Sequence, residues 1–229
     1  MPNTFRGMLV SFTETDPEDE AESNDWFNRE HIDERSTTPG FTRARRYVAV
    51  EGAPKYFATY ETETGSVLAS PEYLRVVSNQ TEWSRRVIPK FTVLERYTLS
   101  LSVDQLHGIG GAVAVVRLSP PEGSDARGAL RAWIAGNVVP EVIKLPGVIG
   151  ACLGENMLEA VNATGDAARA IGGRQVRAEA EEWLVLFEGV APGPVKIAAE
   201  GLTQGIGAYG VDQAVVSGIY RFLYGYYPA

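Results

Sequence analysis

His31 is the residue of this sequence whose type and position best suit acid–base chemistry. It is one of two histidines in 229 residues, and imidazole titrates near neutral pH without help from its surroundings. It follows Glu30 in a predicted helix that a Pro39-Gly40 turn terminates. A neighbouring carboxylate that contacts the imidazole would raise its basicity, so we expect His31 to act as a general base. The alternative is a structural histidine at the negative end of the helix.

The strand predicted after this turn carries two cations and a phenol on one face. Phe41, Arg43, Arg45 and Tyr47 alternate with smaller, mostly apolar residues, and alternate residues of a strand face the same side. We expect the smaller set to face the covering helices, which leaves the larger set on the opposite face. Arg43 or Arg45 would then stabilise an oxyanion or carboxylate, and Tyr47 would donate to a phenol or carbonyl.

Two later strands offer further candidate residues. One contains Tyr60, a second possible donor, and the other contains Glu95 and Tyr97, the latter also a possible donor. Alternation does not decide which face of these strands lines a cavity. The predicted substrate-binding residues are Trp26, Phe41, Glu95, Tyr97 and Tyr220. Such a set is typical of a small-molecule pocket, although the same aromatics would also form a core in which Arg–Glu pairs satisfy each other.

Other kinds of site have weaker support. His31 and Glu34 have the spacing of a helical metal-ligand pair, but few partners are available, and we expect neither metal nor cofactor. Cys152 alternates within a predicted strand, which indicates a small buried residue rather than a nucleophile. His107 lies in a predicted exposed linker.

The composition excludes several classes of protein. The formal net charge is −8 and the longest basic cluster lies within residues 43–46, so we expect no nucleic-acid binding. No apolar run approaches the about 18–20 residues that a membrane helix needs. The N-terminus lacks the pattern of a signal peptide, and one cysteine forbids an internal disulfide, so we expect a cytoplasmic location.

The sequence also repeats itself. Trp26 and Trp133 are each followed 13 residues later by Pro-Gly, and similar strand-like runs flank both segments. We therefore predict an N-terminal repeat (1–103), a linker (104–110) and a diverged C-terminal repeat (111–229) with an insertion near 158–180. The strands are predicted at 6–13, 41–51, 55–63, 90–101, 111–118, 147–157, 181–189 and 211–224, and the helices at 17–37, 66–79, 124–143 and 193–204.

Each predicted half has the order strand, helix, strand, strand, helix, strand. This βαββαβ order is that of a ferredoxin-like unit, with an antiparallel sheet covered by helices on one face. Two units in one chain can cover each other's bare faces. We therefore expect an α+β protein in which two tandem ferredoxin-like repeats form an intramolecular barrel. A partner chain is then not required, although a homodimer stays possible beside the monomer.

The first half resembles the dimeric α+β barrel superfamily, and within it the EthD-like branch. The resemblance rests on residues 25–35 (Asp-Trp-Phe-Asn-Arg-Glu-His-Ile-Asp-Glu-Arg) and 39–47, and is extended by 55–61 and 70–74. The second half has Val138 where His31 would recur. Members of the superfamily include cofactor-free monooxygenases, isomerases, cyclases, decarboxylases, dehydratases and haem enzymes. Haem-degrading members use an Asn, a Trp and a His, but here Trp26, Asn28 and His31 crowd into one helix.

The resemblance and the candidate residues together predict a cofactor-independent enzyme that acts on a small hydrophobic or aromatic molecule. The first expectation is proton-transfer chemistry of the lyase, isomerase, cyclase or decarboxylase type, with His31 as base. The alternatives are a cofactor-free monooxygenase of a phenolic substrate and a non-catalytic barrel that binds small molecules.

Overall fold

The computed structural model describes residues 5–157, 160, 162–163, 182–211 and 213–228. Eight antiparallel strands form a closed barrel in the order β1-β3-β2-β8-β5-β7-β6-β4. The strands are β1 (Gly7–Thr15), β2 (Phe41–Gly52), β3 (Tyr56–Thr62), β4 (Phe91–Asp104), β5 (Ala112–Leu118), β6 (Val148–Asn156), β7 (Trp183–Gly189) and β8 (Ala214–Tyr226). Each half contributes four neighbouring strands in the same relative order, β4-β1-β3-β2 and β8-β5-β7-β6. The α+β fold class and the intramolecular barrel are confirmed.

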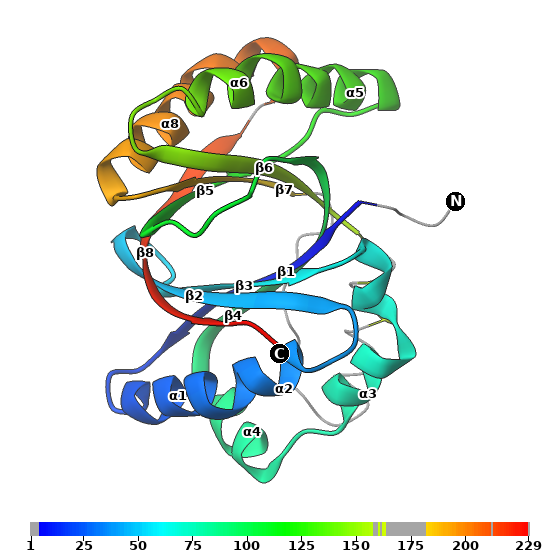
Figure 1. The fold of residues 1–229 in the computed structure, drawn as a ribbon, viewed down its shortest axis with the longest axis vertical. Coiled ribbons are helices and arrows are strands. Elements are labelled where there is room, and N and C mark those ends of the chain that lie inside the picture. The colour runs from blue at the N-terminus through cyan, green and yellow to red at the C-terminus, as the bar shows by residue number, and fades with distance from the viewer. Residues whose placement is uncertain (1–4, 158–159, 161, 164–181, 212, 229) are drawn as a thin grey trace.

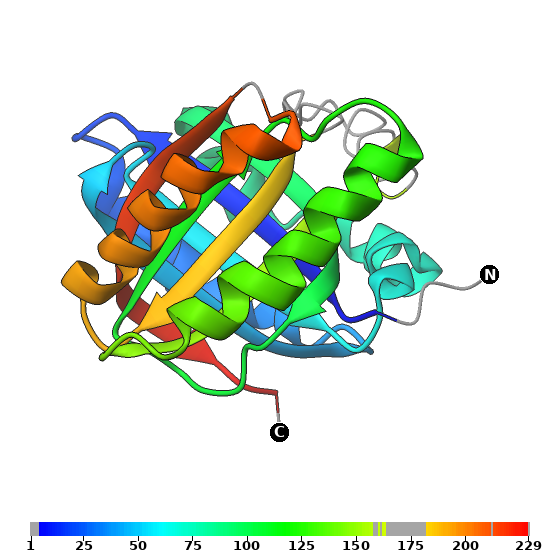
Figure 2. The ribbon, with the colours of Figure 1, turned by 90° about the horizontal axis from the view of Figure 1, so that it is seen from above.

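Helices cover the barrel on two opposite sides (Figure 1). In the first half they are α1 (Glu20–Trp26), the π-helix η1 (Phe27–His31), α2 (Ile32–Ser36), η2 (Gly65–Ala69), α3 (Pro71–Ser78), α4 (Glu82–Val87) and η3 (Ile88–Lys90). In the second half they are α5 (Ser124–Trp133), the π-helix η4 (Ile134–Val138), α6 (Val139–Val142), α8 (Pro192–Gly205) and η5 (Ile206–Tyr209). In the view of Figure 2, α5 and α8 lie on either side of β7. The predicted elements agree closely with these bounds, except that α4 was not predicted and α1 begins at Glu20 rather than at residue 17.

The core has three parts. Met8, Phe12 and Tyr47 belong to a buried cluster that fills the inside of the barrel. Two further clusters lie outside it, one between the sheet and the helices of each half. Cys152 is fully buried in the barrel cluster, as its alternation predicts. Packed side chains therefore fill the interior of the barrel.

The two helical layers share an unusual feature at equivalent positions. A π-helix interrupts the first long helix of each half, at Phe27–His31 and at Ile134–Val138. The turn that follows each helix contains a glycine with the same positive φ of 88°, Gly40 and Gly147. Glycine has no Cβ and adopts this conformation without strain. Short π-helices within α-helices occur frequently at functional sites, and His31 is the last residue of the first one.

The predicted insertion near 158–180 falls almost wholly outside the described residues. The predicted linker at 104–110 begins at the last residue of β4. His107 is exposed there, with its Nε2 3.1 Å from Oε1 of Gln105.

Candidate functional site

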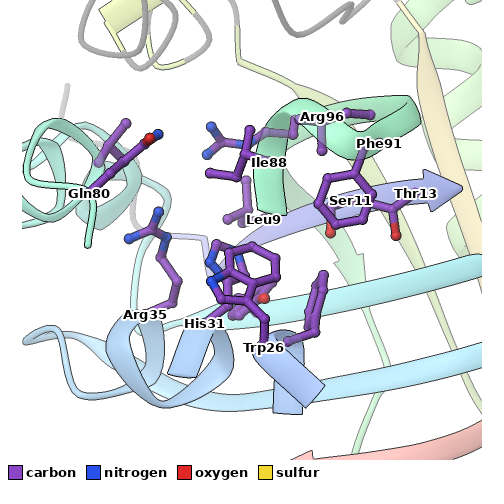
Figure 3. Close-up of a pocket in the computed structure, with 14 residues that line it drawn as sticks. Leu9, Ser11, Thr13, Trp26, His31, Arg35, Gln80, Ile88, Phe91 and Arg96 are labelled. Atoms are coloured by element: carbon purple, nitrogen blue, oxygen red, sulfur yellow. The ribbon is translucent and has the colours of Figure 1, made fainter. Parts of the chain in front are cut away.

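A pocket lies between the sheet of the first half and its helical layer (Figure 3). Its floor is the outer face of the sheet, to which Leu9, Ser11 and Tyr60 contribute, and its walls come from the helices and from η3. Its free volume is about 70 Å³, several times the roughly 10–15 Å³ that one water needs. The lining is mostly apolar with a few polar groups, as is usual for small-molecule sites.

His31 is held in this pocket by aromatic rings. Its imidazole stacks on Trp26, with ring centroids 4.3 Å apart and an interplanar angle of 29°. The rings of Phe27 and Tyr60 approach it edge-on, with centroids at 5.0 and 6.2 Å. Nδ1 of His31 is buried and has no hydrogen-bond partner among the described residues. An unpaired polar atom in an apolar site is costly, so this nitrogen lacks a hydrogen bond that it has the capacity to form.

Trp26 is itself fixed by hydrogen bonds. Its Nε1 donates to Oε1 of Glu30 and to Oγ of Ser84, both at 3.1 Å. The same carboxylate oxygen of Glu30 accepts from Thr81 at 2.5 Å. Glu30 thus links α4 to the helix that carries His31, and the plane of the indole against the imidazole is defined.

The surroundings keep His31 neutral. Burial lowers the pKa of His31 well below its usual value, and the positive charges of Arg35, Arg96 and Arg46 lower it further. None of the predicted flanking carboxylates bonds to the imidazole in the described part of the structure. A neutral imidazole accepts a proton at the nitrogen that carries no hydrogen, although the basicity of His31 is reduced rather than raised.

Tyr60 supplies a second unpaired polar group. Its hydroxyl oxygen is buried without a hydrogen-bond partner among the described residues, and its ring lies edge-on to that of His31. Burial raises the pKa of Tyr60 above its usual value, so the hydroxyl stays protonated at neutral pH. The structure therefore brings together a proton acceptor and a proton donor in one apolar pocket, as acid–base chemistry on an oxygenated substrate requires.

Arg43 and Arg45 lie on the opposite side of the sheet. Nε of Arg43 donates to Oε1 of Glu61 at 2.6 Å, and Nη2 of Arg45 donates to the same oxygen at 2.9 Å. Arg45 also pairs with the buried Glu188. The barrel-side orientation of Arg43, Arg45 and Tyr47 was predicted correctly. The expectation that His31 and either arginine act in one site is wrong. The sheet lies between them, and both guanidinium groups are already paired with carboxylates.

Phe41 does not share the face of Arg43. A β-bulge shifts the pairing of β2 with β3 between Phe41 and Arg43, and an extra residue reverses the alternation of a strand. Phe41 consequently packs in the helix-side cluster, with its ring 5.3 Å from that of Tyr73. The expectation that it faces the barrel is corrected.

Glu95, Tyr97 and Tyr220 are also on the barrel side. Arg117 pairs with Glu95 at 2.6 Å, and its Nη1 donates to the Tyr97 hydroxyl at 3.0 Å. The ring of Tyr220 packs 5.1 Å from that of Phe57 in the same interior cluster. These three residues do not line the pocket of His31. Of the predicted site residues, the structure brings together His31, Tyr60 and Trp26.

Five polar residues of the pocket were not predicted as site residues. Arg35, Gln80 and Arg96 line one end of it, and Ser11 and Thr13 line the other. Arg96 lies between Glu95 and Tyr97 in β4, so its side chain is on the opposite face of the strand from those two predicted residues. Arg35 lies one helical turn after His31, and that spacing was the available signal for it.

The surroundings of His31 do not fit a simple metal centre, because the positive charges of Arg35, Arg46 and Arg96 act on its imidazole and would repel a cation there. Within the described ranges, no three His, Cys, Asp or Glu side chains are grouped as metal ligands.

No helix in the described part of the chain combines the length and the apolar character needed to cross a bilayer.

No protein-family model and no curated protein matches the sequence. Solved structures do match its fold. An anthrone oxidase-like protein has a TM-score of 0.63 at 11% identity, covering 98% of this chain and 94% of that one. A protein assigned as a monooxygenase from Lactobacillus acidophilus NCFM has a TM-score of 0.56 at 9% identity, covering 96% and 93%. A mutant chlorite dismutase from Candidatus Nitrospira defluvii has a TM-score of 0.58 at 9% identity, covering 98% and 93%. At these identities the likeness establishes the shared α+β barrel fold.

Proposed function

We propose that this chain is a cofactor-independent oxygenase that acts on a small phenolic or otherwise activated aromatic molecule in the His31 pocket. The observation that carries the proposal is the presence of two buried, unpartnered polar atoms, Nδ1 of His31 and the hydroxyl oxygen of Tyr60, on neighbouring rings of an otherwise largely apolar site. Oxidase-like and monooxygenase-assigned proteins among the structures with this fold support oxygen chemistry over lyase or isomerase chemistry.

The proposed reaction assigns one task to each group. Nδ1 of His31 removes a proton from an activated ring methylene, which a phenol presents in its keto tautomer, while the Tyr60 hydroxyl donates a hydrogen bond to the conjugated oxygen. The resulting carbanion reduces dioxygen, a C–O bond forms, and protonation gives a hydroperoxide. Loss of water leaves a carbonyl, so an activated methylene and one O₂ yield one carbonyl and one water. Dioxygen is the only oxidant required.

An oxygen electrode with a panel of phenols, naphthols and anthrone tests this proposal. We expect O₂ uptake equal to the carbonyl product formed, and a fall of about 10²–10⁴-fold in His31→Ala, the usual worth of a general base. The matched control is His107→Ala, because that histidine is exposed. Uptake by His31→Ala at the wild-type rate would remove His31 as the base. Substrate turnover without O₂ uptake would instead favour proton-transfer chemistry.

We also propose that the two halves arose by duplication and that the first belongs to the EthD-like branch. The equal strand order of the halves, the matched π-helices and the matched glycines support the duplication. The branch assignment rests on the Glu30-His31 and Pro39-Gly40 pattern alone.

A further inference from the structure

The two ends of the His31 pocket differ in charge. Figure 3 shows Arg35, Gln80 and Arg96 converging on one end, and Ser11 and Thr13 at the other. The middle is formed by rings and aliphatic side chains, including Trp26 and Leu9. A ligand in this pocket would meet two guanidinium groups at one end.

Arg96 has no counter-charge among the described residues. Its Nη2 donates to the neutral hydroxyl of Tyr73 at 2.7 Å, and no described carboxylate lies within the 4.0 Å of an ion pair. A guanidinium has five N–H donors, and a partly buried cation without a partner is expensive. Arg96 is therefore able to bind an anion without breaking an ion pair.

Arg35 also has little counter-charge and is nearly as able as Arg96 to bind an anion. Its side chain is 7% exposed and lies 3.2 Å from Oε2 of Glu34, a single contact by Nη1. Burial raises the pKa of Glu34, which weakens this carboxylate as a permanent counter-ion. The other nearby acid, Glu30, accepts from Trp26, Thr81 and Ser84 instead.

A third cation strengthens the positive potential. Arg46 is buried behind the pocket, its guanidinium carbon 4.3 Å from the ring centroid of Phe27, and Nη1 donates to the neutral amide oxygen of Asn28 at 3.1 Å. Arg35, Arg46 and Arg96 all act electrostatically on His31. Interactions between charges are strong where water is excluded.

We propose that the Arg35–Gln80–Arg96 end of the pocket binds a carboxylate group of the substrate, so that the substrate class is an aromatic carboxylic acid. The planar carboxylate matches the fork of a guanidinium, and the amide of Gln80 offers a further N–H. The ring would then lie along Trp26 and His31. This inference rests on the proposed function. It places the carbon that reacts in the proposed step beside His31.

Three probes of nearly equal shape test the charge preference: 4-fluorobenzoate, 4-fluorobenzamide and 4-fluorobenzamidinium. Their dissociation constants are measured by ¹⁹F NMR titration of the full chain. We expect the benzoate to bind on the order of tenfold or more tighter than the benzamide, as charged hydrogen bonds allow, and the benzamidinium to bind weakest. Arg96→Gln should remove the preference. Arg75→Gln, an exposed arginine on α3, should retain it.

The outcomes separate this inference from the proposed oxygenase. Equal binding of benzoate and benzamide overturns the carboxylate site and leaves the aromatic pocket intact. An unchanged preference in Arg96→Gln, with the fold verified by circular dichroism, also overturns it. A benzoate preference without any O₂ uptake supports the carboxylate site and overturns the oxygenase. Absence of binding by all three probes counts against both.

Discussion

Trp26 and His31 stack face to face although they are five positions apart on one helical segment. At about 100° per residue, an α-helix would separate two such side chains by about 140°. The intervening π-helix, in which the amide of Ile32 bonds to the carbonyl of Phe27, winds more slowly and brings both rings to the pocket side. The reactive geometry of this pocket therefore originates in an irregularity of the backbone.

His31 should make the folded state sensitive to acid. Its folded pKa is depressed, so the unfolded chain binds a proton that the folded chain does not below about pH 6.5. The stabilising contribution of the neutral imidazole is present above that pH and is lost as the pH falls. Urea unfolding should show the wild type losing up to about 1.4 kcal/mol per pH unit more than His31→Phe. His107→Asn should keep the wild-type dependence, and equal slopes for all three would contradict a buried, neutral His31.

Removing the Glu30 carboxylate should loosen the pocket. Glu30→Ala removes the acceptor of the Thr81 hydroxyl proton, although that oxygen still accepts from the Ser84 amide, and leaves Trp26 Nε1 with Ser84 alone. A lost partner at a buried polar group costs about 1–3 kcal/mol. We expect a lower free energy of unfolding and weaker aromatic-ligand binding. Glu30→Gln should retain much of both, since its amide oxygen still accepts. Unchanged ligand affinity in Glu30→Ala would show that the indole does not depend on this bond.

Arg45 should prove structural. Arg45→Met leaves Glu61 and Glu188 buried with less positive charge, and breaking a buried ion pair costs about 3–5 kcal/mol. Chemical denaturation should show this loss, while ligand affinity in the His31 pocket should stay within about twofold at temperatures where the variant is folded. The exposed Arg75→Met should change stability by less than about 0.5 kcal/mol. A folded Arg45→Met that loses ligand binding would return Arg45 to the site.

Two glycine substitutions should have opposite effects. Gly40 has a φ of 88°, and an added Cβ would lie 2.7 Å from Cγ2 of Val67, so Gly40→Ala should destabilise the fold. Gly128 lies in α5 with nothing within 4 Å of an added Cβ, and Gly128→Ala should stabilise by about 0.4–1 kcal/mol. Thermal unfolding of the pair measures both. If Gly40→Ala left the unfolding temperature unchanged, the turn would have to tolerate another conformation.

The order and the approximate limits of the strands could be predicted because alternation and turn residues are local signals. Local signals do not reveal where alternation slips, and the bulge after Phe41 reversed the face expected for that residue. The same limit applied to the first long helix. Regular α-helical periodicity puts Trp26 and His31 on different faces, and the π-helix that brings them together has no local signal in the sequence. Arg96 could not be chosen over Glu95 and Tyr97, because only packing of the sheet against its helices decides which face of β4 meets the pocket.

The barrel is closed within one chain, through β2 with β8 and β4 with β6. In a barrel assembled from two identical subunits, every substitution appears twice, and both helical layers must tolerate it. Here the layers are free to specialise separately. One layer has His31 and a pocket, whereas the other has Val138 in a packed cluster. One half can therefore serve as scaffold for the other.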